Sequence, residues 1–354
     1  MHRIIKLNIT FPNKKMKNLF KRILKILKRV LLVLLGLLLL FLLGTTIWNK
    51  VLCIQEDKAL SRVGTDVKVN GANIRVAVTG EGEKTIVLLS GMGTASPIID
   101  FKPLADKLGD RYKVVTLEYA GYGLSDDSSK ARTNTNVVKE IRDTLRELKI
   151  EPPYILMPHS VSGIYCLQYM KDFPKEVEGM IGIDCSVPNQ AKYDENSEIS
   201  TALYYLARFM DFTGLTRLSY LSGDPYLQDM ENSGGYSKEE MENVNALYSR
   251  TSITNARLSE FRLLKENCKS IYDIKCPDNI PALFILSEDS CKQYKKQMEK
   301  RGYNKTWDGL HKEIISNPDI QKIVYLKGKH YLQWSQSQAI ADMADDFLQG
   351  SKNR

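Results

Sequence analysis

The residues with the clearest chemical potential lie in the segment PHSVSG at 158–163. An apolar run precedes this segment and a stretch with helical spacing follows it, so we expect a sharp turn between a strand and a helix. Such a turn, the nucleophile elbow, exposes the side chain at its apex and makes Ser160 a candidate nucleophile. The alternative interpretation is an ordinary loop serine.

The neighbours of Ser160 support this choice of nucleophile. Strand and helix backbones approach closely at an elbow, so the positions two before and two after the nucleophile must be small. For Ser160 these positions hold Pro158, where glycine is usual, and Ser162. A nucleophile at Ser162 would instead place Ile164 at the crowded position.

The elements around this segment predict an α/β fold. Segments with helical spacing at 137–148, 161–170 and 339–348 alternate with short apolar runs that we interpret as buried strands. This alternation implies a mostly parallel sheet with helices on both faces. The strand runs lie at 85–89, 113–117, 154–157, 180–183, 282–286 and 322–326.

Two further segments complete the predicted architecture. Residues 67–69 and 74–78 alternate between apolar and polar around Asn70-Gly71, which indicates a β-hairpin before the parallel strands. No convincing strand lies between Pro188 and Cys276, where the spacing is helical instead. We interpret that interval as a helical cap inserted over the sheet edge.

Four segments, in this order and spacing, resemble the α/β-hydrolase superfamily over roughly residues 67–348. LLSGMG at 88–93 is similar to the strand and oxyanion loop of the family, with Ser90 in place of histidine. EYAGYGLSD at 118–126 is similar to the D-x-x-G-x-G-x-S segment, and PHSVSG resembles the usual elbow G-H-S-x-G-G. GKH at 328–330 matches the loop that carries the catalytic histidine. The resemblance implies a serine hydrolase of the esterase or proline-iminopeptidase type.

His330 is the candidate general base in this scheme, because a serine hydroxyl is a weak nucleophile until an imidazole takes its proton. His2 lies in the N-terminal tail, His159 adjoins the nucleophile on a turn that points it elsewhere, and His311 lies in a polar helical stretch. A surface loop histidine is the alternative for His330. The oxyanion hole would consist of the backbone N–H groups of Met92 and Val161, a role that tolerates changed side chains.

The acid of the triad is where the chain departs furthest from the family. The commonest pattern places Gly-Glu-x-Asp after the strand at 282–286, but SEDS at 287–290 has serine at the acid position. Asp184 follows the strand at 180–183, a position from which some family members supply the acid, and it keeps the order Ser, Asp, His. We therefore expect Asp184 to be the acid, with Glu288 or Asp289 as alternatives and a dyad without a carboxylate as the third. A structural role at the loop entering the cap is the other interpretation of Asp184.

Composition and charge exclude several classes of protein. With 43% apolar and 26% charged residues, the 354-residue chain is neither disordered throughout nor a multi-pass membrane protein. The net charge is +8, but eleven cations precede the first acid, Glu56, and the rest of the chain carries −3. A mildly acidic body with a basic tail does not suit nucleic-acid binding.

The run VLLVLLGLLLLFLLGTTIW at 30–48 predicts one transmembrane helix. As a helix it would be roughly 28 Å long, close to the thickness of a bilayer core. No A-x-A pattern follows the run, and Lys50 and Leu52 do not suit a lipobox at Cys53, so we expect an uncleaved signal anchor. The preceding cations predict a cytoplasmic N-terminus and an extracellular catalytic domain in the cell membrane.

These observations define the predicted domains and function. We expect a membrane-anchored serine hydrolase that cleaves an ester or related acyl substrate through an acyl-enzyme; the alternatives are a peptidase, an acyltransferase or a non-catalytic binding domain. The cysteines and histidines lack metal-ligand spacing, so we expect no metal and no cofactor, and the expected partners are a small acyl substrate and the lipid bilayer. The predicted segments are a basic tail (1–29), the span (30–48), a linker (49–66), the α/β-hydrolase core (67–189 and 277–354) and the helical cap (190–276).

Overall fold

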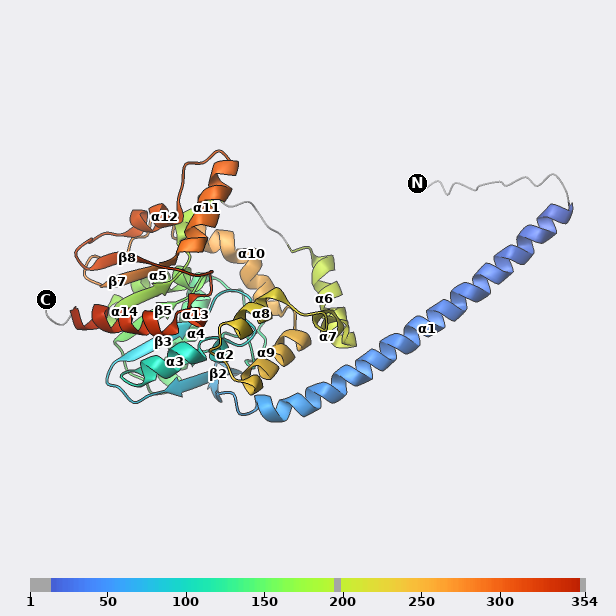
Figure 1. Cartoon of the computed structure of the whole chain (residues 1–354), viewed down its shortest axis with the longest axis horizontal. Coiled ribbons are helices and arrows are strands. Elements are labelled where there is room, and N and C mark those ends of the chain that lie inside the picture. Colours follow the sequence, from blue (N-terminus) through green and yellow to red (C-terminus); the bar gives the residue numbers. More distant parts are fainter. Residues whose placement is uncertain (1–13, 194–198, 351–354) are drawn as a thin grey trace.

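The computed structural model describes residues 14–193 and 199–350, so residues 1–13 of the predicted basic tail and parts of the cap and C-terminus lie outside it. Its centre is an eight-stranded sheet with the strand order β1-β2-β4-β3-β5-β6-β7-β8 (Figure 1). The strands are β1 (Thr65–Val69), β2 (Ala72–Thr79), β3 (Thr85–Leu89), β4 (Lys113–Leu117), β5 (Tyr154–Pro158), β6 (Val177–Ile183), β7 (Ala282–Ser287) and β8 (Gln321–Leu326).

Strand pairing confirms the predicted, mostly parallel sheet. The strands β4, β3, β5, β6, β7 and β8 pair in parallel, and β2 joins them antiparallel to β4. The predicted hairpin joins β1 and β2, with φ of 51° at Asn70 and 90° at Gly71. Positive φ at both central residues is the requirement of a type I′ turn, which asparagine followed by glycine satisfies.

Helices cover both faces of the sheet. Successive residues of a strand point to opposite sides, and on the central strands both sets of side chains are apolar and buried. The helices packed around the sheet are α2 (Pro97–Asp100), α3 (Lys102–Gly109), α4 (Asn134–Glu147), α5 (Ser162–Asp172), α11 (Glu288–Lys300), α12 (Trp307–Ile314), α13 (Leu332–Ser335) and α14 (Ser337–Gly350), with the short 3-10 helices η1 (Pro174–Glu176) and η2 (Pro188–Lys192). Val87, Leu156 and Phe284 face one apolar cluster that includes α4, α5 and α12, whereas Leu88 and Ile155 face a second cluster that includes α3 and α14.

A group of helices is inserted between β6 and β7. Its helices are α6 (Thr201–Thr213), α7 (Leu215–Tyr220), α8 (Pro225–Asn232), α9 (Lys238–Arg250) and α10 (Asn255–Lys269). The helical spacing of the sequence at 202–210, 239–248 and 255–264 corresponds to α6, α9 and α10, whereas α7 and α8 are too short to show a helical period.

Helix α1 (Lys14–Leu60) extends away from the body of the protein (Figure 1). Within the described residues it is the one helix that is long and apolar enough to cross a membrane. The helix continues through most of the segment 49–66, which we predicted to be a linker. The sequence has no glycine or proline between Gly44 and Gly64, so nothing interrupts the helix before its end at Leu60.

Candidate active site

Ser160 occupies the apex of the turn between β5 and α5, where its φ is 52°. A non-glycine residue in this left-handed region is strained and persists only where the surroundings fix it. Here the carbonyl of Ser160 accepts a hydrogen bond of 2.7 Å from the N–H of Ser186, beyond the end of β6. A Cβ at Gly91 would lie 2.9 Å from the Cβ of Ser160, so the β3–α2 loop passes directly against the turn. The side chain of Ser160 is half-buried.

Ser162, the other serine of the motif, has a different environment. Its side chain is fully buried, and its hydroxyl donates to the carbonyl of Ser90 and lies 2.7 Å from the hydroxyl of Tyr119. These partners tie α5 to the end of β3 and to the segment after β4. The hydroxyl of Ser162 therefore holds the turn together, and that of Ser160 is the more accessible one.

The structure brings Asp184 and His330 together, although they are 146 positions apart in the chain. Asp184 directly follows β6 and is fully buried, and His330 lies in the loop between β8 and α13 with 39% of its side chain exposed. The Nδ1 of His330 donates to Oδ2 of Asp184 over 2.7 Å. A histidine bonded in this way keeps Nε2 free to exchange a proton with another group.

The carboxylate of Asp184 accepts three further hydrogen bonds. The backbone N–H of Ser287 and the indole N–H of Trp307 donate to Oδ1 over 3.1 and 2.9 Å, and the hydroxyl of Ser290 donates to Oδ2 over 2.5 Å. Burial by itself raises the pKa of Asp184, but the hydrogen bond and charge of His330, with the bonds from Ser290 and Ser287, outweigh it. The pKa of Asp184 therefore lies below its ordinary value, and the group is a carboxylate at neutral pH.

Glu288 and Asp289, the alternative acids, begin helix α11, where both side chains pair with Lys292 at 3.6 Å. The structure brings Asp184, rather than either of them, to the ring of His330. Ser290 stands where the Gly-Glu-x-Asp pattern has its aspartate, and its hydroxyl is the one that donates to Oδ2 of Asp184. The hydroxyl of Ser287 donates to the carbonyl of Gly328 over 2.6 Å, so Ser287 fixes the loop that carries His330.

His159 contacts the candidate base, a role that the sequence analysis did not assign to it. Its ring lies 4.6 Å from that of His330, centroid to centroid, and its Nε2 donates to the backbone carbonyl of His330 over 3.1 Å. Burial and the nearby charge of His330 lower the pKa of His159 to about 3. His159 is thus a neutral residue that holds the candidate base in place, and its position beside Ser160 in the motif was the available signal.

The two N–H groups predicted to form an oxyanion hole flank the Ser160 turn. Val161 follows Ser160 at the start of α5, and Met92 follows Gly91 in the loop that touches Ser160. Within the described residues, neither N–H donates a hydrogen bond. Both groups are therefore available to a developing negative charge.

Arg257 of helix α10 holds the loop that contains Met92. Its Nη2 donates to the carbonyls of Gly93 and Thr94 over 3.2 and 2.7 Å, and its guanidinium lies 4.9 Å from the ring centroid of Tyr122. The hydroxyl of Tyr122 in turn accepts from the N–H of Gly93 over 3.3 Å. The inserted helices thus fix the conformation of a loop that belongs to the sheet. A local sequence pattern cannot predict this contact, because it joins residues 164 positions apart.

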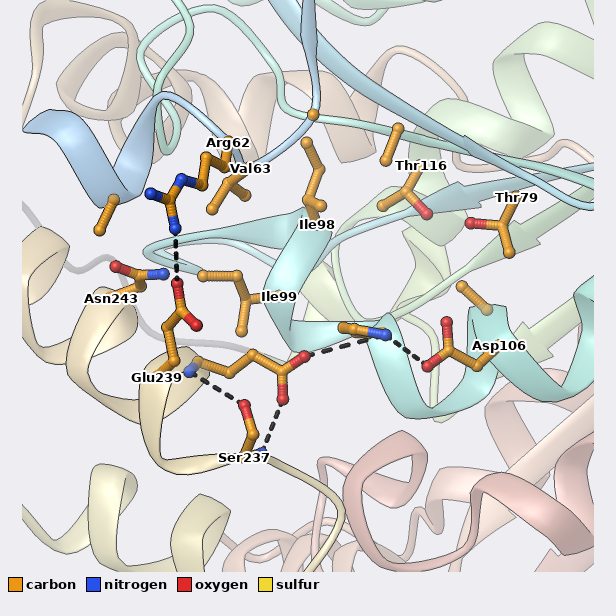
Figure 2. Close-up of a pocket in the computed structure, with 16 residues that line it drawn as sticks. Arg62, Val63, Thr79, Ile98, Ile99, Asp106, Thr116, Ser237, Glu239 and Asn243 are labelled. Atoms are coloured by element: carbon orange, nitrogen blue, oxygen red, sulfur yellow. Dashed lines mark hydrogen bonds and ion pairs between the residues drawn. The ribbon is translucent and has the colours of Figure 1, made fainter.

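Of two cavities in the protein, one is lined by the candidate base His330 and the other lies near α1. One of about 600 Å³ is lined by His330, and the aromatic rings of Tyr226, Tyr331 and Trp334 form part of its wall. The other, of about 310 Å³, lies between α2, α9 and the segment that follows α1, near the ion pair of Arg62 and Glu239 (Figure 2). Because the first cavity has a candidate catalytic residue in its wall, it is the better candidate for a substrate pocket.

Known proteins show the same fold. The sequence model of the family described as alpha/beta hydrolase fold matches residues 84–336. Uncharacterized protein YbdG of Bacillus subtilis is 33% identical over 170 residues, which are 48% of this chain and 52% of that protein, so the match spans about half of the relative. Among solved structures, epoxide hydrolase VrEH1 from Vigna radiata has a TM-score of 0.57 at 16% identity, with 81% of this chain and 97% of that chain covered. A laboratory-evolved variant of potato epoxide hydrolase StEH1 has a TM-score of 0.58 at 18% identity, with 81% and 98% covered.

The three carboxylates give the first testable prediction. Replacing Asp184 by asparagine should reduce kcat on an activated aryl ester by about 10⁴-fold, because an amide cannot hold the imidazole in the tautomer that accepts a serine proton. Glu288→Gln and Asp289→Asn should stay within about tenfold of the parent, since each loses an exposed ion pair with Lys292 rather than a hydrogen bond to His330.

The comparison needs folded variants with matched melting temperatures, because Asp184 also joins three elements of the structure. An active Asp184→Asn protein alongside an inactive Glu288 or Asp289 variant would assign the acid to α11 instead.

The depressed pKa of His159 predicts a pH dependence of stability. Unfolding returns the ring to an ordinary pKa of about 6.5, so between pH 6.5 and about 3 the unfolded chain binds one more proton than the folded chain. As the pH falls through this range, His159 should lower the free energy of unfolding by about 1.4 kcal/mol per pH unit. His159→Gln replaces the imidazole N–H donor by an amide N–H donor and removes this titration.

The measurement is the melting temperature of the detergent-solubilised protein and of His159→Gln from pH 7 to pH 4. The melting temperature of the parent should fall more steeply on acidification. Parallel curves for the two proteins would show that His159 is not a buried neutral residue.

Proposed function

Because the chain belongs to the family with the alpha/beta hydrolase fold, we propose that it is a membrane-anchored serine hydrolase that cleaves an acyl ester. The observation that carries the proposal is the buried Asp184 carboxylate on Nδ1 of His330, in a fold that places Ser160 at the apex of the strand-to-helix turn. A hydroxyl, an imidazole and a carboxylate in these positions have the roles of nucleophile, base and orienting acid.

In the proposed reaction, Nε2 of His330 takes the proton of Ser160 while the serine Oγ attacks the ester carbonyl. The N–H groups of Met92 and Val161 stabilise the resulting oxyanion, and Asp184 stabilises the imidazolium. The imidazolium then protonates the departing alcohol, which leaves an acyl group on Ser160. Water attacks this acyl-enzyme with His330 again as base, the imidazolium returns the proton to the departing Oγ of Ser160, and the carboxylic acid is released.

Peptide cleavage and acyl transfer proceed through the same acyl-enzyme and differ only in the leaving group or the acceptor. A panel of esters of graded chain length and aminoacyl arylamides distinguishes these reactions. The epoxide hydrolases among the similar solved structures are only 16–18% identical to this chain, so they share its fold and do not indicate its reaction. A non-catalytic domain is the remaining alternative, and it would not need a buried, four-fold hydrogen-bonded carboxylate on His330.

The proposed anchor is the apolar part of α1. Its leucine side chains are largely exposed, for example Leu31 at 66% and Leu40 at 66%, which in water would leave a large apolar surface uncovered. A bilayer would cover this surface, and ten cations precede it. We propose that these cations stay in the cytoplasm and that the catalytic domain lies outside the cell.

Covalent labelling tests the proposed nucleophile. The purified full-length protein should react with a fluorophosphonate probe, and Ser160→Ala should lose both the labelling and ester turnover while keeping its melting temperature. Losses of many thousand-fold in kcat are usual when a triad nucleophile is removed. Ser162→Ala is the matched variant, and labelling that disappears there but persists in Ser160→Ala would move the nucleophile to Ser162.

Protease accessibility tests the proposed topology. Protease added to intact cells should digest the body of the protein and spare a tag placed at the N-terminus, because the cations before the span remain inside. An intact cytoplasmic marker protein serves as the control for lysis. A body that resists protease until the cells are broken would reverse the orientation.

A further inference from the structure

We infer that the outward face of helix α6 is a membrane-binding surface that lies in the lipid headgroup region, beside the end of the apolar part of α1. We define this α6 surface by five exposed apolar side chains: Leu203, Tyr205, Leu206, Phe209 and Phe212. The inference rests on the proposed membrane anchor and is independent of the proposed chemistry.

A buried polar cluster fixes the insertion to α1 just past the apolar run. Asn49, only 4% exposed, donates from Nδ2 to the carbonyl of Asp211 over 3.1 Å and accepts at Oδ1 from Nε of Arg217 over 3.0 Å. Arg217 also pairs with Glu56 at 2.6 Å. Buried charged and polar groups must keep such partners, because an unpaired group would be costly. The joint between α1 and the α6–α7 corner therefore has a defined geometry.

The backbone at this joint approaches α1 closely. Gly214 ends α6 with φ of 78°, and a Cβ there would lie 2.8 Å from the Cβ of Asn49 and 2.9 Å from the carbonyl oxygen of Thr45. Thr45 belongs to the apolar run, and Asn49 is the first residue after it. The end of α6 therefore lies at the level where the proposed span leaves the bilayer.

The orientation of α6 is fixed by the face opposite the α6 surface. The hydroxyl of Tyr204 donates to Oδ1 of Asn255 over 2.7 Å, and the carboxylate of Asp211 accepts from Ser252 and from the hydroxyl of Thr216. These contacts turn one side of the helix toward the insertion. The five apolar side chains consequently point away from it, with exposed fractions of 47–66%.

Three features favour lipid as the occupant of this surface. The surface is continuous with the proposed span through the Thr45 and Asn49 contacts, and α6 runs across the direction of α1 rather than along it (Figure 1). It contains tyrosine and phenylalanine, and aromatic residues collect at membrane interfaces. Lys50 lies with its Nζ 5.7 Å from the ring centroid of Phe212, a position from which its charge reaches lipid phosphates while its stem stays apolar.

Depth-dependent quenching in the full-length protein tests this inference. Tyr205→Cys carries the probe on the α6 surface, and Tyr325→Cys is the matched control, because Tyr325 is a similarly exposed tyrosine on β8. Leu38→Cys marks the proposed span. The background replaces the two partly exposed cysteines, Cys53 and Cys291, by serine.

Each protein is labelled with NBD and reconstituted in vesicles of phosphatidylcholine and phosphatidylglycerol at 3:1. Quenching by lipids that carry a nitroxide near the glycerol should be several-fold stronger at position 205 than at position 325, and aqueous iodide should show the reverse. Labelling at Phe209→Cys repeats the measurement, and the melting temperature shows whether each labelled protein is folded.

The outcomes separate the surface from the anchor. Lipid quenching at position 38 with iodide quenching at position 205 would overturn the α6 surface and leave the anchor intact. A label at position 205 that is shielded from both quenchers, with shielding that increases with the protein-to-lipid ratio, would assign the surface to a second copy of the chain. Iodide quenching at all positions would overturn both the surface and the anchor, and none of these results depends on hydrolase activity.

Discussion

The carboxylate of Asp184 is buried away from water, and the site around it depends on how that charge is accommodated. A buried charge is costly unless it is paired and hydrogen-bonded, and here donors converge on it from β7, α11, α12 and the loop after β8. Their positions in the chain are separated from Asp184 by more than 100 residues. The proposed base is therefore held only when the carboxyl ends of these strands and the following helices are assembled together.

The turn of Ser160 is coupled to the same strand end. Its carbonyl accepts from Ser186, two residues after Asp184, and its N–H donates to the carbonyl of Ile183 over 3.4 Å. His159 completes the arrangement by bonding to the backbone of His330. The strained φ of Ser160 is thus maintained by contacts to the elements that position the acid and the base, so the three proposed catalytic groups are placed by one connected set of hydrogen bonds.

The sequence was informative wherever the signal is local. The apolar runs of the strands, the Asn70-Gly71 turn and the motif around Ser160 each depend on a few neighbouring residues, and the structure has the corresponding elements. Contacts across the chain left no such signal: Trp307 on Asp184, Arg257 on the carbonyls of Gly93 and Thr94, and Asn49 with Arg217. The preference for Asp184 over Glu288 came from the serine at the usual acid position and from the place of Asp184 after an earlier strand, where some family members have their acid, whereas the donors that keep it charged are visible only in the fold.

The loop that contains Met92, one of the two proposed oxyanion donors, is also where the main parts of the molecule meet. Arg257 of the insertion bonds to Gly93 and Thr94, and Leu60 at the end of α1 packs with Ala95 of the same loop and Leu247 of α9. Stabilisation of an oxyanion requires donors that are already in place, since reorganisation during the reaction would reduce the benefit. A change in how α1 or the insertion sits on the body would therefore act on the segment next to Met92, which connects the proposed anchor to the proposed chemistry.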